Sequence, residues 1–231
     1  MTPLPIHPRD IIAGARARGE TCLSEHLSKR VLAAYGVPIT LEMPVRDARA
    51  AVAAALEVGF PLVLKGNAPG LAHKTEAGLV EVGLNDEAAV AAAARRILAK
   101  MGPGGGLLVQ EMVKGQREFL LGMKRDAQFG PCVSFGLGGI FAEALNDVVL
   151  RLAPLTMAEA DAMLDGIRAA AMLGAYRGLP PVDRQQLCRA LVGLGRVAMD
   201  YPEIAEIDVN PVIISGSRPV AVDALIVLGE T

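Results

Sequence analysis

The chain has 231 residues, enough for one large domain or for two small lobes with cores of their own. Charge is nearly balanced, with 23 basic and 25 acidic residues and a net charge of −2, while aromatic residues make up 3% and tryptophan is absent. Nucleic acids and anionic membranes are bound through basic surfaces, so this composition gives no reason to expect either as a partner.

No segment predicts export or membrane insertion. The N-terminus, MTPLPIHPRD, lacks the basic and then apolar run of a secretory signal. The longest uncharged stretch, residues 127–142, is interrupted by glycine and proline and does not predict a membrane-spanning helix. The three cysteines, Cys22, Cys132 and Cys188, are scattered without metal-ligand spacing. Such an odd, dispersed set is typical of reduced thiols, and we expect a cytoplasmic protein.

The first predicted elements are an arm, two helices and a strand. Residues 1–20 hold three prolines and few periodic apolar positions, and we interpret them as an N-terminal arm. A helix with one apolar stripe is expected over residues 24–35 and a short strand over residues 37–41. Asp47 can cap the alanine-rich helix that follows and that ends near residue 59.

The next strand leads into the most informative loop of the first half. Residues 61–64 form an apolar run that ends on Lys65, and small turn-forming residues separate this lysine from His73. A cation at a strand end can hold a phosphate group. The loop can carry its histidine because Gly70 and Gly78 tolerate backbone angles that other residues resist. The alternative is that both side chains are ordinary solvated surface groups.

A glycine-rich segment then divides the sequence. A strand is expected over residues 79–84, followed by a helix from Asn85 with acidic residues in its first turn and basic residues toward its end. The segment GPGGG at residues 102–106 is the clearest break in the chain. We therefore predict a first lobe over residues 21–106 and a second lobe over residues 107–231.

The second half opens with two strands that bring acidic residues together. An apolar strand over residues 107–109 leads to Glu111, and after a turn Glu118 begins the next strand. Two nearby carboxylates can bind ribose hydroxyls, an amino group or a metal, or can mark an exposed hairpin edge. A further strand ends in the glycine cluster at residues 136–139, which can present backbone N–H groups to a phosphate or simply form a turn.

Helices and strands continue to alternate to the C-terminus. Thr156 and Glu159 form a capping-box pattern that opens a helix ending near residue 174, and another helix is expected over residues 183–199. Two strands follow, over residues 204–214 and 220–228. This alternation predicts an α/β or α+β protein in two lobes.

The last two strands carry a candidate metal site. Asp208 and Asn210 are two residues apart, so on a strand they face the same side. A two-residue turn at positions 216–217 would place Asn210 opposite Asp223. Carboxylate and amide oxygens are ligands that Mg²⁺ prefers, and an aspartate in an apolar strand needs a partner or an ion. A hydrogen-bonded structural pair is the alternative. The chain has neither a GxxxxGK[ST] motif nor a dinucleotide fingerprint, so any bound ATP must be held differently.

Taken in order, these pieces resemble an ATP-grasp domain. The motifs that carry the resemblance are GFPLVLK, HK eight residues beyond that lysine, LLVQEMVKG, KRDAQFGP, FGLGGIFAE, RLAPL, RGLPPVD, EIDVNP and AVDALI. Their types and order are similar to those of ADP-forming (NDP-forming) acyl-CoA synthetases over about residues 22–228. The length resembles that of a free-standing beta subunit of acetate–CoA ligase (ADP-forming).

The resemblance implies an α+β ATP-grasp fold whose two lobes clasp ATP or ADP together with Mg²⁺. It implies the reversible reaction acyl-CoA + ADP + phosphate = carboxylate + ATP + CoA. The family's CoA-binding domains have no counterpart in this sequence, so the resemblance also implies a partner alpha subunit and a heterotetramer.

The resemblance further implies roles for individual residues. Those assigned to the nucleotide are Lys65 at the phosphates, Glu111 and Val113 at the adenine, and Glu118 at the ribose. Those assigned to Mg²⁺ are Asn210 and Asp223, with Asp208 adjacent. His73 would be phosphorylated transiently on a mobile loop. Glu143 and Arg151 fall in family motifs without an assigned role.

The sequence departs from the family pattern near the histidine and leaves two other functions open. Residues 70–72 replace the usual acidic and apolar approach to the histidine, and Ala77 stands where a glycine is common. One alternative is a stand-alone ATP-grasp carboxylate ligase, which would not need His73. The other is a nucleotide-binding regulatory module without turnover. Which carboxylic acid is the substrate, and whether the nucleotide is ATP or GTP, are left open by the sequence.

Overall fold

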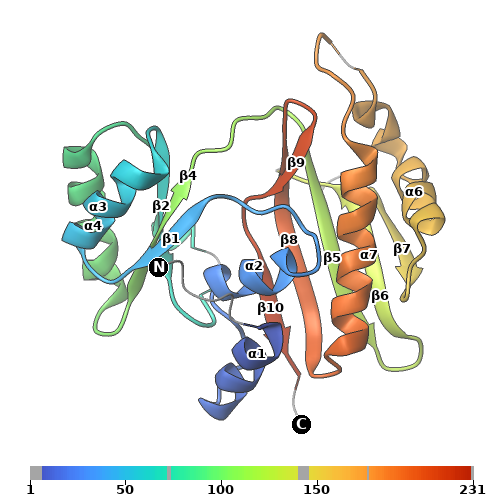
Figure 1. Cartoon of the computed structure of the whole chain (residues 1–231), viewed down its shortest axis with the longest axis horizontal. Coiled ribbons are helices and arrows are strands. Elements are labelled where there is room, and N and C mark those ends of the chain that lie inside the picture. Colours follow the sequence, from blue (N-terminus) through green and yellow to red (C-terminus); the bar gives the residue numbers. More distant parts are fainter. Residues whose placement is uncertain (1–6, 72–73, 140–145, 176, 230–231) are drawn as a thin grey trace. The chain divides into compact units, whose positions relative to one another are not determined.

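The structure is a computed structural model that describes residues 7–71, 74–139, 146–175 and 177–229 (Figure 1). Its helices are α1 (Pro8–Ala17), α2 (Glu25–Ala33), α3 (Ala48–Val58), α4 (Glu87–Met101), α6 (Met157–Gly166), the 3₁₀ helix η1 (Arg168–Leu173) and α7 (Arg184–Asp200). Its strands are β1 (Glu42–Val45), β2 (Leu62–Asn67), β3 (Val80–Leu84), β4 (Gly106–Glu111), β5 (Glu118–Asp126), β6 (Gly130–Leu137), β7 (Val148–Leu152), β8 (Ile204–Ser215), β9 (Arg218–Ala221) and β10 (Leu225–Leu228).

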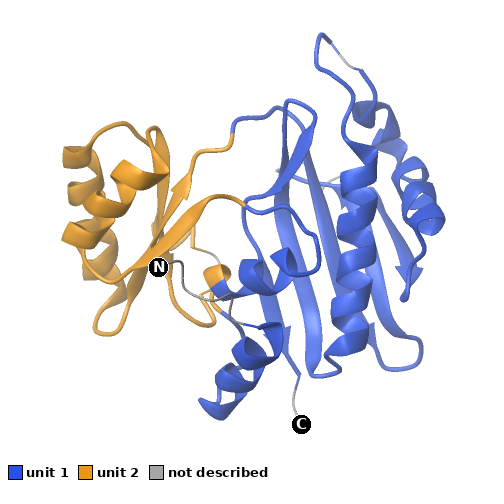
Figure 2. Ribbon diagram, in the orientation of Figure 1, with its two compact units in different colours: residues 1–23, 27–39, 114–231 blue, residues 24–26, 40–113 orange. Residues whose placement is uncertain are grey.

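The chain divides into two compact units (Figure 2). Unit 1 comprises Met1–Leu23, Leu27–Ile39 and Lys114–Thr231, and unit 2 comprises Ser24–His26 and Thr40–Val113. This division corrects the boundary expected at residue 106. Strand β4 lies in unit 2 because it forms hydrogen-bonded ladders on both of its edges, with β1 and with β2. Most of the helix predicted over residues 24–35 lies in unit 1, outside the lobe to which the sequence assigned it.

Unit 2 is a four-stranded antiparallel sheet with two helices on one face. The strand order is β1-β4-β2-β3, and α3 and α4 cover one side of it. The core between them combines helix residues, most of them alanine, with larger strand residues: Ala51, Ala54, Ala55, Val90, Ala93, Ala94 and Ile97 against Leu62, Leu64, Leu107 and Val109. The predicted cap at Asp47 is confirmed, but Asp86 rather than Asn85 caps α4.

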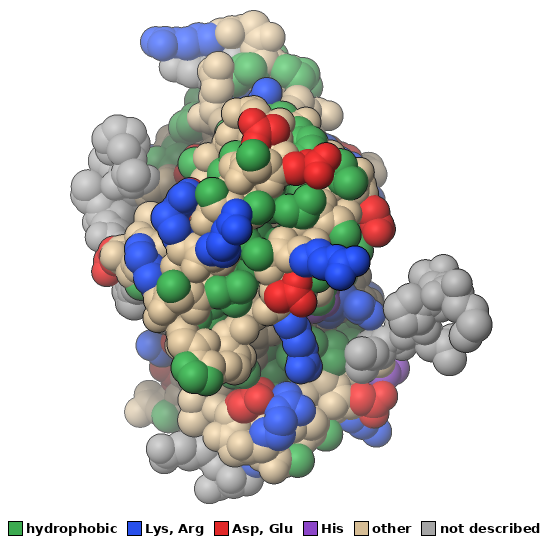
Figure 3. Space-filling view, turned by 90° about the vertical axis from the view of Figure 1, so that its left-hand side faces the viewer, with side chains coloured by type: hydrophobic (Ala, Val, Ile, Leu, Met, Phe, Trp, Pro, Cys, Tyr) green, Lys and Arg blue, Asp and Glu red, His purple; other side chains and the backbone are tan. Residues whose placement is uncertain are grey.

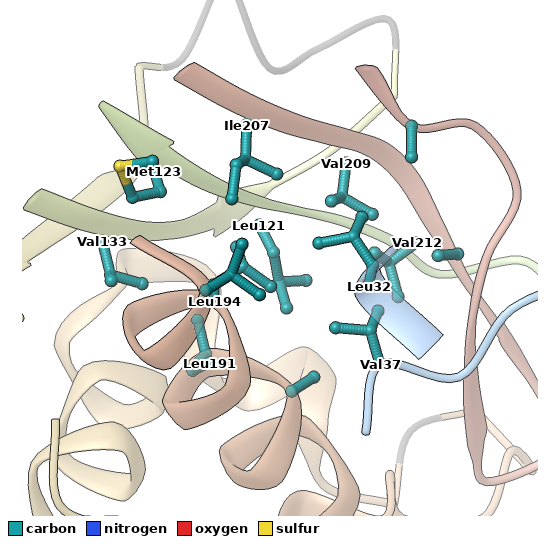
Figure 4. Close-up of a cluster of buried hydrophobic side chains, with 14 of the residues drawn as sticks. Leu32, Val37, Leu121, Met123, Val133, Leu191, Leu194, Ile207, Val209 and Val212 are labelled. Atoms are coloured by element: carbon teal, nitrogen blue, oxygen red, sulfur yellow. The ribbon is translucent and has the colours of Figure 1, made fainter. Parts of the chain in front are cut away.

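Unit 1 is built on a larger sheet. Its strands run in the order β10-β8-β5-β6-β7, with β9 paired to β8. Helix α7 packs on one face, and Figure 4 shows Leu191 and Leu194 of this helix beside Leu121 of β5 and Ile207 of β8. Leu121 and Met123 of β5 and Ile207 and Val209 of β8 are therefore buried in this core, and the residues between Ile207 and Val209 or beside them face the opposite side.

Two glycines of α7 have different surroundings, which gives a matched test of this packing. A Cβ atom at Gly193 would collide with the carbonyl oxygen of Tyr35, whereas at Gly195 the nearest atom would be Ala153 Cβ at 3.4 Å. We expect Gly193→Ala to lower the free energy of unfolding by about 2 kcal/mol, because close backbone packing leaves no room for a methyl group. Gly195→Ala should raise it by about 0.5 kcal/mol, because alanine favours the helix. Urea titrations of both variants measure this difference.

Four segments differ from the predicted elements, one of them the strand expected over residues 220–228, which is divided into β9 and β10. The expected N-terminal arm contains α1, because Pro8 occupies the first helical turn and apolar residues, Ile11 among them, are buried. The strand expected over residues 37–41 forms only an isolated bridge at Ile39, and β1 begins later. The helix expected to run to residue 174 ends at Gly166. Asp147 accepts hydrogen bonds from the first N–H groups of η1 and so starts a separate turn there.

The described helices and one face of the surface can be compared with what composition predicts about membranes and charge. In the described ranges, no helix combines the length and the hydropathy that crossing a bilayer requires. Figure 3 shows the face that carries α3 and α4, where basic and acidic side chains are interspersed with apolar ones.

Candidate functional site

In unit 1 the predicted metal and ribose residues share one face of the sheet. Ile207 and Val209 of β8 are buried in the core, and Asp208 and Asn210 alternate with them on the other face. Asp208 pairs with Gly122 of β5, and Glu118 lies four residues before that glycine. Residues an even number of positions apart on one strand face the same side of the sheet, so Glu118 faces the same side as Gly122. Gly122 pairs with Asp208, so Glu118 and Asp208 also lie on the same side.

The register of the last hairpin agrees with the one predicted. Ser215 pairs with Arg218 across the turn, and Asp208 pairs with Leu225 further along. Between these pairs Val222 donates its N–H to the carbonyl of Pro211. The same register therefore holds on both sides of the break between β9 and β10, and it sets Asn210 opposite Asp223. Asn210 also lies in a bulge, where two residues of β8 oppose Leu120 of β5.

Asp208 is the most perturbed carboxylate of this face. It keeps solvent access, yet surrounding protein atoms displace part of the water around the carboxylate. This desolvation, together with the negative charges of Asp223 and Glu206, raises the pKa of Asp208 to about 6. Glu206 was not singled out by the sequence analysis, although it continues the alternation of Asp208 and Asn210. Carboxylates whose pKa is shifted by burial and by neighbouring charges are common in functional sites.

The raised pKa predicts how stability responds to neutralising Asp208. The folded state holds this proton more tightly than the unfolded state, so ionised Asp208 disfavours folding above pH 6 and has no effect below pH 4. Two pKa units correspond to about 3 kcal/mol, but solvent screening reduces this to about 1 kcal/mol. We expect Asp208→Asn to stabilise the metal-free protein by that amount at pH 8 and not at pH 4. Urea titrations in EDTA at both pH values measure the difference.

The donor set of this face suits Mg²⁺. Asp208, Asn210 and Asp223 offer carboxylate and amide oxygens, and a cation would offset the mutual repulsion of the two aspartates. In the part of the chain that the structure describes, no three His, Cys, Asp or Glu side chains form a metal-binding group.

In unit 2 the predicted phosphate-binding lysine lies inside the protein. Leu62 and Leu64 of β2 pack under the helices, so Lys65 points to the opposite face of the sheet. It is 4% exposed, and its Nζ lies 2.7 Å from Oε1 of Glu25. The second oxygen of Glu25 contacts Nζ of Lys74. Glu25 is 5% exposed and Lys74 9% exposed, so one buried carboxylate joins both lysines.

The residues predicted at the adenine and ribose have defined local contacts. Glu111 exchanges two hydrogen bonds with Leu41: its Oε1 accepts from the Leu41 N–H at 2.8 Å, and its own N–H donates to the Leu41 carbonyl. Val113 is the last residue of unit 2 and is partly exposed. A Cβ atom at Gly139 would lie 2.7 Å from Oε2 of Glu118, so the glycine leaves room for this carboxylate.

The glycine cluster owes its composition to close packing. Gly138 donates its N–H to the carbonyl of Glu118, and Leu137 donates to that of Asp147. A Cβ atom at Gly138 would lie 2.7 Å from the backbone of Phe119. These two N–H groups are engaged within the sheet, which favours the structural interpretation of the cluster.

Three predicted positions remain. His73 and Glu143 lie outside the described residues. Arg151 lies on β7, is exposed, and donates to the carbonyl of Leu150 at 2.9 Å. The structure thus brings Lys65 and Glu111 onto adjacent strands of unit 2, and Glu118, Asp208, Asn210 and Asp223 onto one face in unit 1.

Comparison with known proteins gives a consistent result. A family model described as an ATP-grasp domain matches residues 14–228. The beta subunit of acetate–CoA ligase [ADP-forming] I from Pyrococcus furiosus is 37% identical over 226 residues, which cover 95% of this chain and 97% of that subunit.

Solved structures agree with the sequence matches. Dinucleotide forming acetyl-coenzyme A synthetase 1 of Ca. Korarchaeum cryptofilum, in complex with coenzyme A, Ca-AMPCP and HgCl+, is 39% identical with a TM-score of 0.90. The match covers 96% of this chain and 99% of that one. A second structure of that protein contains coenzyme A and Mg-AMPPCP, with its phosphohistidine segment pointing towards the nucleotide binding site; its TM-score is 0.86, with 39% identity, covering 96% of this chain and 100% of that one.

These matches confirm the predicted α+β ATP-grasp fold and the resemblance stated from the motifs. They extend over nearly the whole of this chain and nearly the whole of the beta subunit it matches. The chain therefore belongs to the ATP-grasp family and, within it, to the ADP-forming acyl-CoA synthetases, as a homologue of the beta subunit of acetate–CoA ligase (ADP-forming).

Proposed function

We propose that this chain is the nucleotide-binding subunit of an ADP-forming acyl-CoA synthetase and that His73 carries phosphate between the nucleotide and a partner subunit. The overall reaction is acyl-CoA + ADP + phosphate = carboxylate + ATP + CoA. In the direction of ATP use, a nitrogen of the neutral imidazole attacks the γ-phosphorus while the bond from that phosphorus to the bridging oxygen of ADP breaks. ADP leaves, and the phosphoryl group remains on the histidine.

One observation carries the proposal. A structure matched over 96% of this chain holds Mg-AMPPCP and has a phosphohistidine segment pointing towards its nucleotide site. In this chain His73 follows Lys65 by eight residues. The lysine is fixed on β2 by a buried carboxylate, which supports its role as a fixed cation beside the nucleotide phosphates.

Each of the remaining residues would bind a different part of the nucleotide or its metal ion. Glu111 and the backbone at Val113 would meet the adenine, and Glu118 the ribose. Asn210 and Asp223, with Asp208 adjacent, would hold Mg²⁺, whose chemistry is to neutralise charge on the β- and γ-phosphates. Lys65 would bind the transferring phosphoryl group. The register that sets Asn210 opposite Asp223 and the raised pKa of Asp208 support this metal assignment.

The proposed partner is a CoA-binding alpha subunit in a heterotetramer. The matched relative is named as a beta subunit, and this chain covers 97% of it. The acid-binding pocket would then belong to the partner, and acetate is the substrate suggested by the relative's name. Co-expression with a candidate alpha subunit should give a complex that makes acyl-CoA. Acyl-CoA formed by this chain alone would contradict the assignment of CoA and acid binding to a partner subunit.

Labelling of the isolated chain tests the phosphohistidine. We expect incubation with Mg²⁺ and γ-³²P-labelled ATP to leave protein-bound label that is lost in acid and kept in base, as expected of a phosphorus–nitrogen bond. A parallel incubation with α-labelled ATP controls for nucleotide that simply stays bound. Absence of label, or label that survives acid, would overturn the proposed function.

A further inference from the structure

We propose that Glu25 is a positioning residue that clamps both ends of the segment between Lys65 and Lys74. The inference rests on the proposed function, because Lys74 directly follows His73 in the sequence. Glu25 is distant in sequence from this segment, and neither the motifs nor the comparisons assign it a role. Its position in the first turn of α2 brings it into unit 2.

The geometry is that of one carboxylate shared by two cations. Oε1 of Glu25 accepts a hydrogen bond from Nζ of Lys65 at 2.7 Å, and Oε2 accepts one from Nζ of Lys74. The carboxylate side chain is 2% exposed, and the lysine side chains are 5% and 10% exposed. Screening by water and salt is weak at such burial, so both contacts hold their geometry more firmly than surface ion pairs do.

The backbone fixes the same two ends. The N–H of Gly66, next to Lys65, donates to the carbonyl of Leu79 at 2.8 Å. The N–H of Leu79 in turn donates to the carbonyl of Lys74 at 2.8 Å. Main chain and side chains therefore hold the residues on either side of the intervening segment, and Glu25 joins them through their charged ends.

The clamp has a consequence for the transfer step. Fixing the two ends reduces the conformations open to the segment that contains His73, so the nucleophile is offered to the phosphates from a limited range of positions. Glu25 itself touches neither the nucleotide nor the reacting atoms in this scheme. Its removal should slow phosphorylation of His73 while changing the nucleotide affinity much less.

Lysine reactivity tests the clamp without any requirement for activity. Native wild-type protein, Glu25→Gln and the control Glu81→Gln are treated briefly with acetic anhydride, and acetylation of each lysine is followed by mass spectrometry. Glu81 forms an exposed ion pair with Arg96 in the same unit, so its substitution removes a carboxylate elsewhere. We expect acetylation of Lys65 and Lys74 to accelerate at least tenfold in Glu25→Gln only. Unchanged rates at both lysines in folded Glu25→Gln would overturn the clamp.

A double-mutant cycle tests its role in the reaction. We expect Glu25→Gln and Lys74→Met each to slow histidine labelling at least tenfold at saturating ATP, with the KM for ATP changed less than threefold. If Glu25 acts on the loop through Lys74, the double variant should be no slower than the slower single variant. The positioning role would be overturned if the double variant slowed histidine labelling by the product of the two single effects. It would also be overturned if either folded single variant were labelled at the wild-type rate.

The two experiments separate failure of this inference from failure of the proposed function. A wild-type protein that takes up no label contradicts the phosphohistidine function, while the acetylation rates still decide whether Glu25 clamps the lysines. A wild-type protein that is labelled normally, with Glu25→Gln labelled at the same rate, contradicts only the positioning role. Lys74→Met keeps the Lys65–Glu25 pair, so the cycle retains one informative variant if Glu25→Gln does not fold.

Discussion

His73→Asn is expected to abolish phosphohistidine formation, with a loss of labelling of at least about 10³-fold. Asparagine is close to histidine in size but has no nitrogen lone pair able to attack phosphorus, so the substitution removes the nucleophile with little change in bulk. Binding of Mg-ATP should persist, because Lys65 and the proposed metal ligands are unchanged. The measurement is acid-labile label from γ-labelled ATP beside the Kd for a non-hydrolysable ATP analogue.

The chain supplies its own controls, because it contains only three histidines. His7 is exposed and caps α1 by accepting a hydrogen bond from the Arg9 N–H. His26 is partly buried and its Nδ1 lies 3.0 Å from Oε1 of Glu42. We expect His7→Asn and His26→Asn to keep the wild-type label. Label that persists in His73→Asn and disappears in one of these variants would transfer the role to that histidine.

Local sequence signals predicted those parts of the molecule that local chemistry determines. The capping box at Thr156 and Glu159 is confirmed, because both hydrogen bonds join residues three apart. The hairpin register followed from a two-residue turn and strand alternation, and the Ser215–Arg218 and Asp208–Leu225 pairs agree with it. The burial of Ile207 and Val209 on either side of the exposed Asp208 likewise follows from strand alternation.

The parts that the sequence analysis missed depend on contacts between distant segments. Glu25 lies 40 residues from Lys65 and 49 from Lys74, and its neighbours in sequence form an ordinary helix start. The boundary expected at the glycine-rich segment was displaced because β4 finds its partners, β1 and β2, on the N-terminal side of that break. A glycine run marks where the chain turns, but strand pairing determines which unit a strand joins.

Arg117 is a second residue that no motif indicated, and its removal should have the largest effect on stability. It immediately precedes β5 and is 2% exposed. Nη1 donates to the carbonyls of Met172 and Gly174 at 3.0 and 3.1 Å. Nη2 donates to those of Pro180 and Gly216 at 2.8 and 3.0 Å. One planar guanidinium therefore joins the end of η1 and the segment after it to the turn between β8 and β9.

Arg117→Met should leave the four carbonyls of Met172, Gly174, Pro180 and Gly216 without this donor. Each lost hydrogen bond to the charged guanidinium costs about 1 kcal/mol, because water at the partly exposed acceptors recovers part of the loss. We expect the free energy of unfolding to fall by about 3 to 4 kcal/mol, which corresponds to a decrease in Tm of about 10 °C for a chain of this size. Arg117→Lys should recover less than half of this loss, since an ammonium cannot reproduce the planar fork.

The matched control is Arg189→Met on α7, which removes an exposed arginine from the same unit and should change stability by less than about 0.5 kcal/mol. Urea titrations followed by circular dichroism compare the three variants with the wild type. Because Gly216 follows Ser215 at the end of β8, loosening this turn should also weaken Mg-ATP binding through Asn210 and Asp223. An Arg117→Met protein as stable as the Arg189→Met protein would show that water satisfies these carbonyls without the guanidinium.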